Sequence, residues 1–267
     1  MALPLRWARA AYEYFCFCLG YAYFGILGLL LTLASALLYP LLSWQRGARL
    51  GRSAIGVVFR SFLGILRASG VLKVDLSALD TLRYEPGVII APNHPCLLDA
   101  VFVISRVPNT GCIMKAQIWD NLVLGGGARL AGYIRNDSPR SMVRQATREL
   151  RAGHPLLVFP EGTRTRSAPV NEFRGGFALV AKLAGAPIQT VFIETDNPFL
   201  GKGWPLFRRP CFPLVYRVRL GERFRVTGDV KSFLRSLQDY YRHQLRPPAP
   251  AQQHARSAAE PADLIAD

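Results

Sequence analysis

The pattern of hydrophobic and polar positions predicts a long helix near the N-terminus. Residues 14–45 lie between Glu13 and Arg46 and carry no charged side chain. A helix needs roughly 20 apolar residues to cross a bilayer, so this run is long enough to do so. Pro40 is expected to end or kink the helix. Two alternatives are open: a buried core helix, and a signal peptide cleaved after the Ala-Ser-Ala of residues 34–36.

A second, amphipathic helix is predicted over residues 48–68. Apolar side chains recur there at helical spacing, with Arg60 and Arg67 among them. Such a helix can lie in the headgroup layer of a membrane or pack on the folded domain, and the pattern fits both. Arginines at 46, 49 and 52 follow the uncharged run. By the positive-inside rule they indicate a cytoplasmic location for the domain that follows.

From residue 71 onward, apolar strand-like segments alternate with helical ones. Strands are expected at 72–76, 88–91, 110–115, 155–159, 186–194, 214–220 and 223–227. Helices are expected at 97–106 and 138–152, before Gly185, and at 230–245. Strand–helix–strand order implies parallel strands joined by right-handed crossovers. The predicted fold class is α/β: a mixed, largely parallel central sheet flanked by helices, with an N-terminal membrane-associated helical element.

The same pattern divides the chain into three parts. Residues 1–70 form the membrane helix and the amphipathic helix, and residues 71–246 form the catalytic domain. Residues 247–267 are rich in Ala, Pro and Gln, a composition that predicts a disordered tail.

Two polar motifs follow predicted strands. Asn93, His94 and Asp99 come after the strand at 88–91, and Phe-Pro-Glu-Gly-Thr-Arg at 159–164 ends the later strand. Open α/β sheets bind ligands at the carboxyl ends of their strands, so both motifs are expected at one site. Asp99 can accept a hydrogen bond from one ring nitrogen of His94, which leaves the other nitrogen as a base. If that base deprotonates a substrate hydroxyl, no serine nucleophile is needed.

The second motif supplies groups that suit an anionic substrate. Arg164 can bind a phosphate bidentately, Gly162 allows a tight turn, and Thr163 can donate a hydroxyl hydrogen bond. Glu161 can orient the arginine or the acceptor hydroxyl; the alternative is a structural Glu–Arg ion pair within a turn. Cys96 could be considered as a thiol nucleophile, but no second base is evident for it, so a small polar loop residue is the better interpretation.

Charge adds an anionic partner to this picture. Lys and Arg number 33 against 18 Asp and Glu, a formal net charge of +15. Such an excess favours a membrane surface, a phosphorylated substrate, an acidic carrier protein or a nucleic acid. No nucleic-acid-binding motif is visible, and the apolar N-terminus favours lipid. The five cysteines, an odd number without a Cys-x-x-Cys pair, support neither a disulfide framework nor a zinc site.

Together the motifs resemble the glycerol-phosphate acyltransferase superfamily, which includes the 1-acylglycerol-3-phosphate acyltransferases. His-x-x-x-x-Asp at 94–99 and Phe-Pro-Glu-Gly-Thr-Arg at 159–164 match two of its signatures. The resemblance suggests that Lys115 helps to hold an acidic headgroup. Another signature is matched only loosely around Gly132 and Arg135, as in variant bacterial members, which makes Arg135 an anion-binding candidate and leaves the acceptor headgroup open.

The resemblance implies a membrane-associated enzyme of lipid biosynthesis. It would move an acyl chain from acyl-CoA or acyl carrier protein to a hydroxyl of a lysophospholipid-like acceptor, by default lysophosphatidic acid, with His94 as general base and Asp99 orienting it. It would need no metal and no cofactor, and would act at a bacterial inner membrane with its catalytic domain in the cytoplasm. The implied substrate-binding residues are Asn93, Lys115, Arg135, Glu161, Gly162, Thr163 and Arg164.

Two other functions are open. One is a lipid hydrolase or thioesterase in which the same His–Asp pair acts on water, although the sequence lacks Gly-x-Ser-x-Gly. The other is a non-catalytic basic protein that binds membranes.

Overall fold

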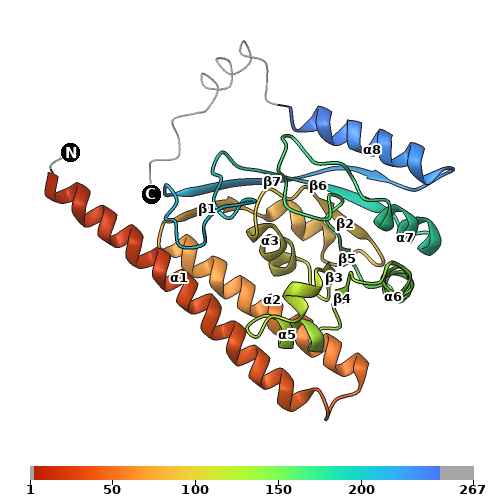
Figure 1. Ribbon diagram of the computed structural model, residues 1–267, viewed down its shortest axis with the longest axis horizontal. Coiled ribbons are helices and arrows are strands. Elements are labelled where there is room, and N and C mark those ends of the chain that lie inside the picture. The colour runs from red at the N-terminus through yellow and green to blue at the C-terminus, as the bar shows by residue number, and fades with distance from the viewer. Residues whose placement is uncertain (1–2, 247–267) are drawn as a thin grey trace.

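The structure is a computed structural model that describes residues 3–246. A seven-stranded sheet forms its centre. The strands follow the order β1-β7-β6-β2-β5-β3-β4 (Figure 1). All neighbouring strands are parallel except β6 and β7, which confirms the predicted fold class. The predicted tail lies outside the described residues. The strands are β1 Leu72–Asp75, β2 Ile89–Pro92, β3 Gly111–Met114, β4 Ile134–Arg135, β5 Leu156–Leu157, β6 Ile188–Glu194 and β7 Leu214–Phe224.

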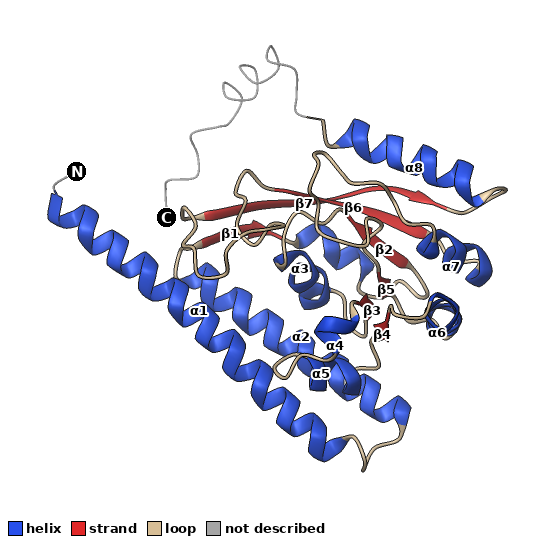
Figure 2. Cartoon of the chain, viewed as in Figure 1, coloured by secondary structure: helices blue, strands red, loops and turns tan. Residues whose placement is uncertain are grey.

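Helices cover both faces of this sheet (Figure 2). Strand side chains alternate between the faces. Ile90, Leu157 and Val191 point into a core shared with α1, α2 and α3, whereas Ile89 and Leu156 point into a second core shared with α6, α7 and α8. The helices are α1 Leu3–Leu38, α2 Trp44–Ala68, η1 Ser77–Leu82, α3 Leu98–Arg106, α4 Ala116–Trp119, α5 Gly125–Leu130, α6 Pro139–Arg151, α7 Gly176–Ala184 and α8 Val230–Gln244.

The two N-terminal helices form a hairpin along one side of the domain (Figure 1). The α1 helix is long enough and apolar enough to cross a membrane, by length and composition. The α2 helix buries Ile55, Phe62, Leu63 and Leu66 against the domain. Of the two alternatives for this amphipathic helix, packing on the domain is therefore the one observed.

A glycine-rich run, residues 125–127, lets α1 approach the domain closely. A Cβ on Gly126 would lie 2.6 Å from the Thr32 side chain, and one on Gly127 would lie 2.7 Å from Leu31. The run forms the start of α5 and packs on α1. Its glycines are explained by helix packing rather than by an approach to phosphate.

The strands predicted at 214–220 and 223–227 are wrong as separate elements, because β7 runs unbroken from Leu214 to Phe224. Gly221 suggests that the strand is interrupted, but the glycine instead allows β7 to pass close to β6. A Cβ there would lie 2.4 Å from the Phe192 ring and 2.5 Å from Thr190 Oγ1 on β6. Only glycine lets the two strands pass at this point, next to a register shift in β6.

Candidate active site

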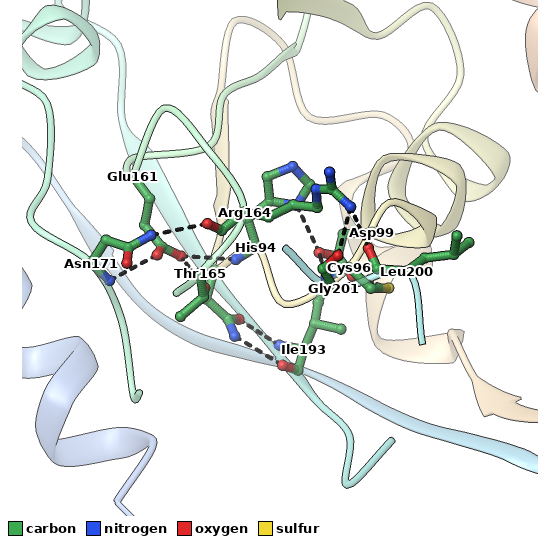
Figure 3. A network of polar contacts seen from close by, with 11 residues as sticks. His94, Cys96, Asp99, Glu161, Arg164, Thr165, Asn171, Ile193, Leu200 and Gly201 are labelled. Atoms are coloured by element: carbon green, nitrogen blue, oxygen red, sulfur yellow. Dashed lines mark hydrogen bonds and ion pairs between the residues drawn. The ribbon is translucent and has the colours of Figure 1, made fainter. Parts of the chain in front are cut away.

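His94 and Asp99 meet between the end of β2 and the start of α3. His94 Nδ1 lies 2.8 Å from Asp99 Oδ2 (Figure 3). The aspartate is fully buried, whereas 13% of the His94 side chain is exposed. The sequence spacing predicts this contact, and the structure contains it. With Nδ1 engaged by the carboxylate, Nε2 is the ring nitrogen left for chemistry.

Asp99 is fixed by further donors. Its Oδ2 also accepts the Cys96 backbone N–H at 2.8 Å, and its Oδ1 accepts the Cys96 thiol at 3.1 Å. Burial raises the pKa of Asp99, while the hydrogen bond and charge of His94 oppose the shift. A buried carboxylate whose two oxygens are both hydrogen-bonded holds the imidazole in one orientation. A general base needs such a fixed orientation for proton transfer.

Phe159 completes the setting of the imidazole. Its ring stacks on the His94 ring, with centroids 3.7 Å apart and planes tilted by 17°. The residue belongs to the second motif, but residue type and spacing predict no role for it. The signal that could have indicated a role for Phe159 is its position, a large apolar residue at the end of the predicted strand and two residues before Glu161. The stack shields one face of His94 from solvent and fixes the ring plane.

Glu161 joins the two motifs. It is 1% exposed and accepts hydrogen bonds from the His94 backbone N–H at 3.0 Å, the Asn171 N–H at 2.8 Å and the Thr165 hydroxyl at 2.8 Å (Figure 3). Burial raises its pKa, against the effect of these donors. Glu161 therefore ties the His94 loop to the second motif. Of the interactions considered for it, an ion pair with the Arg164 side chain is not among the contacts of the described residues.

Asn93 also has a structural position. Its side-chain amide bonds both backbone groups of Ile193, accepting from N–H at 2.7 Å and donating to C=O at 2.9 Å. The side chain is buried and ties the end of β2 to β6. The resemblance implies a substrate-binding role for Asn93, but its side chain is engaged by a strand a hundred residues later.

Cations gather on the open side of His94. Lys115 Nζ lies 3.4 Å from Thr163 Oγ1, and Arg164 Nη1 donates to the backbone carbonyls of Leu200 at 2.7 Å and Gly201 at 2.8 Å. Lys202, in the loop that Arg164 holds, has its pKa lowered by the charges of Lys115, Arg166 and Arg164. The sequence motifs do not predict Lys202 as a site residue, because a long stretch of chain separates it from them.

Gly162 and Thr163 line the pocket next to His94, but Arg135 does not. The turn at Gly162 uses a φ of 66°, which only glycine adopts freely. Arg135 is engaged by Asp120 at 3.0 Å and Asp137 at 2.6 Å. Its guanidinium is not among the groups that line the pocket, so the structure does not support the anion-binding position predicted for it.

An apolar pocket of about 510 Å³ extends from His94. Helices α1 to α5 and strand β3 contribute to its walls, with Phe24, Ile55, Phe59, Val101 and Ile104 among the lining residues. Lys115, Thr163, Arg164 and Lys202 line its polar end. The arrangement thus has a base at the junction between an apolar chamber and a cationic rim.

Cys96 lies behind the aspartate rather than in the pocket. The residue is 1% exposed, and burial raises the pKa of its thiol well above the usual value, with the nearby Asp99 charge adding to the shift. A thiol that is dry and protonated is a poor nucleophile.

We therefore expect Cys96→Ser to keep activity within about ten-fold of the parent protein, whereas loss of a covalent nucleophile costs about 10⁴-fold or more. Initial rates of acyl transfer for the two proteins distinguish these cases. Loss of nearly all activity, with an unchanged circular dichroism spectrum, would restore the nucleophile interpretation.

Part of this chain, including His94 and Asp99, is similar to a known protein family. Residues 73–194 match the family described as Acyltransferase. A chloroplastic 1-acyl-sn-glycerol-3-phosphate acyltransferase of Brassica napus is 25% identical over 137 residues, which are 49% of this chain and 40% of that protein. A lyso-ornithine lipid O-acyltransferase of Rhodobacter capsulatus is 35% identical over 92 residues, 33% of each chain. This chain thus matches less than half the length of either relative.

A solved structure extends the likeness to nearly the whole fold. The 1-acyl-sn-glycerophosphate acyltransferase of Thermotoga maritima superposes with a TM-score of 0.66 over 96% of this chain and 99% of that chain. At 17% identity, the match concerns the fold alone.

Proposed function

Since residues 73–194 match the family described as Acyltransferase, we propose that this chain belongs to the glycerol-phosphate acyltransferase superfamily and is a membrane-associated O-acyltransferase. It takes an acyl chain from the thioester of coenzyme A or acyl carrier protein and transfers it to a hydroxyl of a lysophospholipid-like acceptor. One observation carries the proposal: the His94–Asp99 pair, 2.8 Å apart, stands between an apolar chamber and a cationic rim.

The proposed reaction runs in one displacement. Nε2 of His94 takes the proton of the acceptor hydroxyl while the oxygen attacks the thioester carbonyl carbon. Asp99 stabilises the imidazolium that forms. The carbon–sulfur bond then breaks, and the imidazolium returns its proton to the departing thiolate. The products are the acylated lipid and the free thiol.

The apolar chamber supports a long acyl chain as the transferred group. Its walls combine aliphatic and aromatic side chains from several helices, which is the lining expected around a lipid tail. Burial of each methylene contributes about 0.8 kcal/mol, so a chain held there adds binding energy in proportion to its length.

The cationic rim supports a phosphate as the acceptor headgroup. Lys115, Arg164 and Lys202 line it, and Arg166 is close enough to influence Lys202. The nearby carboxylates, Asp99 and Glu161, are buried and already hydrogen-bonded. A phosphomonoester, with up to two negative charges, matches this set better than a zwitterionic headgroup. Lysophosphatidate is therefore the first acceptor to test, with lyso-ornithine lipid as the comparison.

The N-terminal hairpin supports the proposal that the protein acts at a membrane surface. Polar contacts tie α1 to the domain from Ala10, which accepts from Arg209, to Thr32, which donates to Val123 C=O. That distance is roughly 33 Å at 1.5 Å per residue, about the thickness of the hydrocarbon core. Because α1 is tied to the domain over this whole length, a bilayer-spanning α1 would pull part of the domain into the hydrocarbon core. We propose that α1 instead lies in one leaflet, on its exposed apolar side.

The decisive experiment supplies a palmitoyl thioester with and without an acceptor. Mass spectrometry should detect phosphatidate when lysophosphatidate is present and little free palmitate when it is absent. Palmitate released at the same rate without acceptor would favour the hydrolase or thioesterase. No turnover of either kind, with retained binding to vesicles, would favour the non-catalytic basic protein.

The rim can be tested on its own. Lys115→Gln combined with Lys202→Gln should raise the apparent KM for lysophosphatidate about ten-fold, because two charge-assisted contacts to phosphate are lost. The KM for the thioester should change little. Arg235→Gln, at an exposed position of α8, is the control and should change neither constant. A rise in the thioester KM instead would reassign the rim to the donor.

A further inference from the structure

A second hollow lies on the other face of the sheet. This groove, of about 670 Å³, runs between α6 and α7 and is lined by Arg140, Arg144, Arg148, Arg151, Leu179 and Leu183 among others. The two leucines are 41% and 47% exposed. The groove shares no lining residue with the pocket at His94.

The arginines of α6 form a stripe. Their spacing of four, four and three residues places them on one side of the helix. Arg151 donates to Leu183 C=O at 2.7 Å and joins the two helices. Within residues 3–246, Arg140, Arg144 and Arg148 have no carboxylate partner, and the one acid of α6, Glu149, is buried on its other side.

This stripe carries a local cost. Like charges four residues apart on a helix are destabilising, and α6 repeats the arrangement twice. Local rules that a chain breaks without an internal compensation tend to mark functional surfaces. An external partner rich in carboxylates would turn the repulsion into attraction.

The membrane does not fit as that partner. The apolar surface of the protein gathers at α1 and beside it, where Phe207 contacts Tyr21 and Thr32 bonds the loop that carries Leu122. The groove belongs to the opposite face of the sheet, with α6 and α7 on the far side of the domain from α1 (Figure 1). A bilayer that covers the exposed side of α1 would leave the groove in water.

A small anion does not fit either. The charges extend along a helix of 13 residues, about 20 Å long, and do not converge on one point. An acidic helix laid alongside would present carboxylates at the same spacing, while Leu179, Leu183 and Val143 offer an apolar floor. The groove also begins at Pro139, three residues after Asn136, which lines the pocket at His94. The Pro139 end of the groove is therefore close along the chain to the pocket that contains His94.

We propose that the groove between α6 and α7 docks an acidic acyl carrier protein, which delivers the acyl thioester to His94. The proposal rests on the proposed acyltransferase function and selects the protein-bound thioester as a donor that the chain recognises. Electrostatic complementarity of this kind acts mainly on the rate of encounter, so it should be sensitive to salt.

The test compares two donors in two matched variants. Arg140→Glu/Arg144→Glu reverses two charges in the groove, at the second and sixth positions of α6. Lys231→Glu/Arg235→Glu reverses two charges at the same positions of α8, which is the control. Kinetics are measured with palmitoyl acyl carrier protein and with palmitoyl-coenzyme A.

The α6 variant should raise the KM for palmitoyl acyl carrier protein about ten-fold or more, and weaken its dependence on salt. Its KM for palmitoyl-coenzyme A should change less than about two-fold, and the α8 variant should change neither. Equal effects on both donors, no effect, or a parent protein that uses palmitoyl-coenzyme A but refuses the carrier-bound donor would overturn the proposal. So would a greater loss of binding to anionic phosphatidylglycerol vesicles in the α6 variant than in the α8 variant.

Failure of the proposed function would look different. If the parent protein consumes neither donor, titration of labelled acyl carrier protein into the parent and both variants still measures docking. Binding that the α6 variant alone loses would keep the docking surface and discard the reaction. Absence of binding by the parent would discard the docking surface.

Discussion

His94→Ala is expected to lower kcat for acyl transfer by at least about 10²–10⁴-fold, the usual contribution of general-base catalysis. The acceptor alcohol is a weak nucleophile at neutral pH until its proton is removed. Nε2 is the nitrogen available to remove it, because Nδ1 lies 2.8 Å from the buried Asp99 carboxylate. The stack with Phe159 and the pocket walls belong to other residues, so substrate affinity should fall far less than kcat.

The chain contains a matched control for this substitution. His154 also places Nδ1 near a carboxylate, 3.0 Å from Glu149 Oε2, but it lies outside the pocket. His154→Ala should keep kcat close to that of the parent. Asp99→Asn should also lower kcat strongly, as His94→Ala does, because an amide at this position can favour the wrong tautomer of the His94 imidazole. If His94→Ala retains most of its transferase activity, the proposed mechanism is wrong.

The local part of the site could be predicted from the sequence. His94 and Asp99 are five residues apart across one turn, so their contact depends on little more than a strand ending before a helix. The two motifs meet because both follow parallel strands, β2 and β5, which pair directly. Alternating apolar segments similarly predict the largely parallel sheet. The catalytic and binding roles of these residues stay predictions until activity is measured.

Distant partners could not be predicted in this way. Asn93 and Glu161 look like substrate ligands in the motifs, but each is buried and bonds backbone groups of neighbouring segments. Arg135 looks available for an anion, but two aspartates occupy it. Lys202 lies at the rim in a loop whose backbone carbonyls accept hydrogen bonds from Arg164. Apart from the local contact of Arg135 with Asp137, the deciding contacts are tertiary ones, which neither residue type nor spacing encodes.

Arg52 is the clearest example of such a contact. By position it belongs with Arg46 and Arg49 as a cation flanking a membrane helix, and those two are exposed. The Arg52 side chain is 2% exposed, and Nη2 donates to Glu149 Oε2 at 2.7 Å. Its Nε donates to Ala131 C=O at 2.9 Å, so one guanidinium connects α2 to α6 and to the end of α5.

Arg52→Ala is therefore expected to lower the free energy of unfolding by about 3–5 kcal/mol, the usual cost of removing one partner of a buried ion pair. Arg49→Ala should change it by less than about 0.5 kcal/mol. Urea unfolding of the protein in detergent, followed by circular dichroism, measures both. Arg52→Met/Glu149→Leu should recover much of the loss, because no unpaired charge is then left buried.

The pair also predicts a dependence on pH. Burial acts to raise the pKa of Glu149, but the hydrogen bond and charge of Arg52, with a smaller part from His154, outweigh it and hold that pKa below its ordinary 4.5. A carboxyl whose pKa is depressed by folding adds stability above its unfolded pKa and loses it as the pH falls through the folded value. The parent should thus lose stability below about pH 4.5 more steeply than Arg52→Met/Glu149→Leu. Equal acid sensitivity in the two proteins, or equal unfolding energies for Arg52→Ala and Arg49→Ala, would mean that the contact between α2 and α6 does not hold the hairpin on the domain.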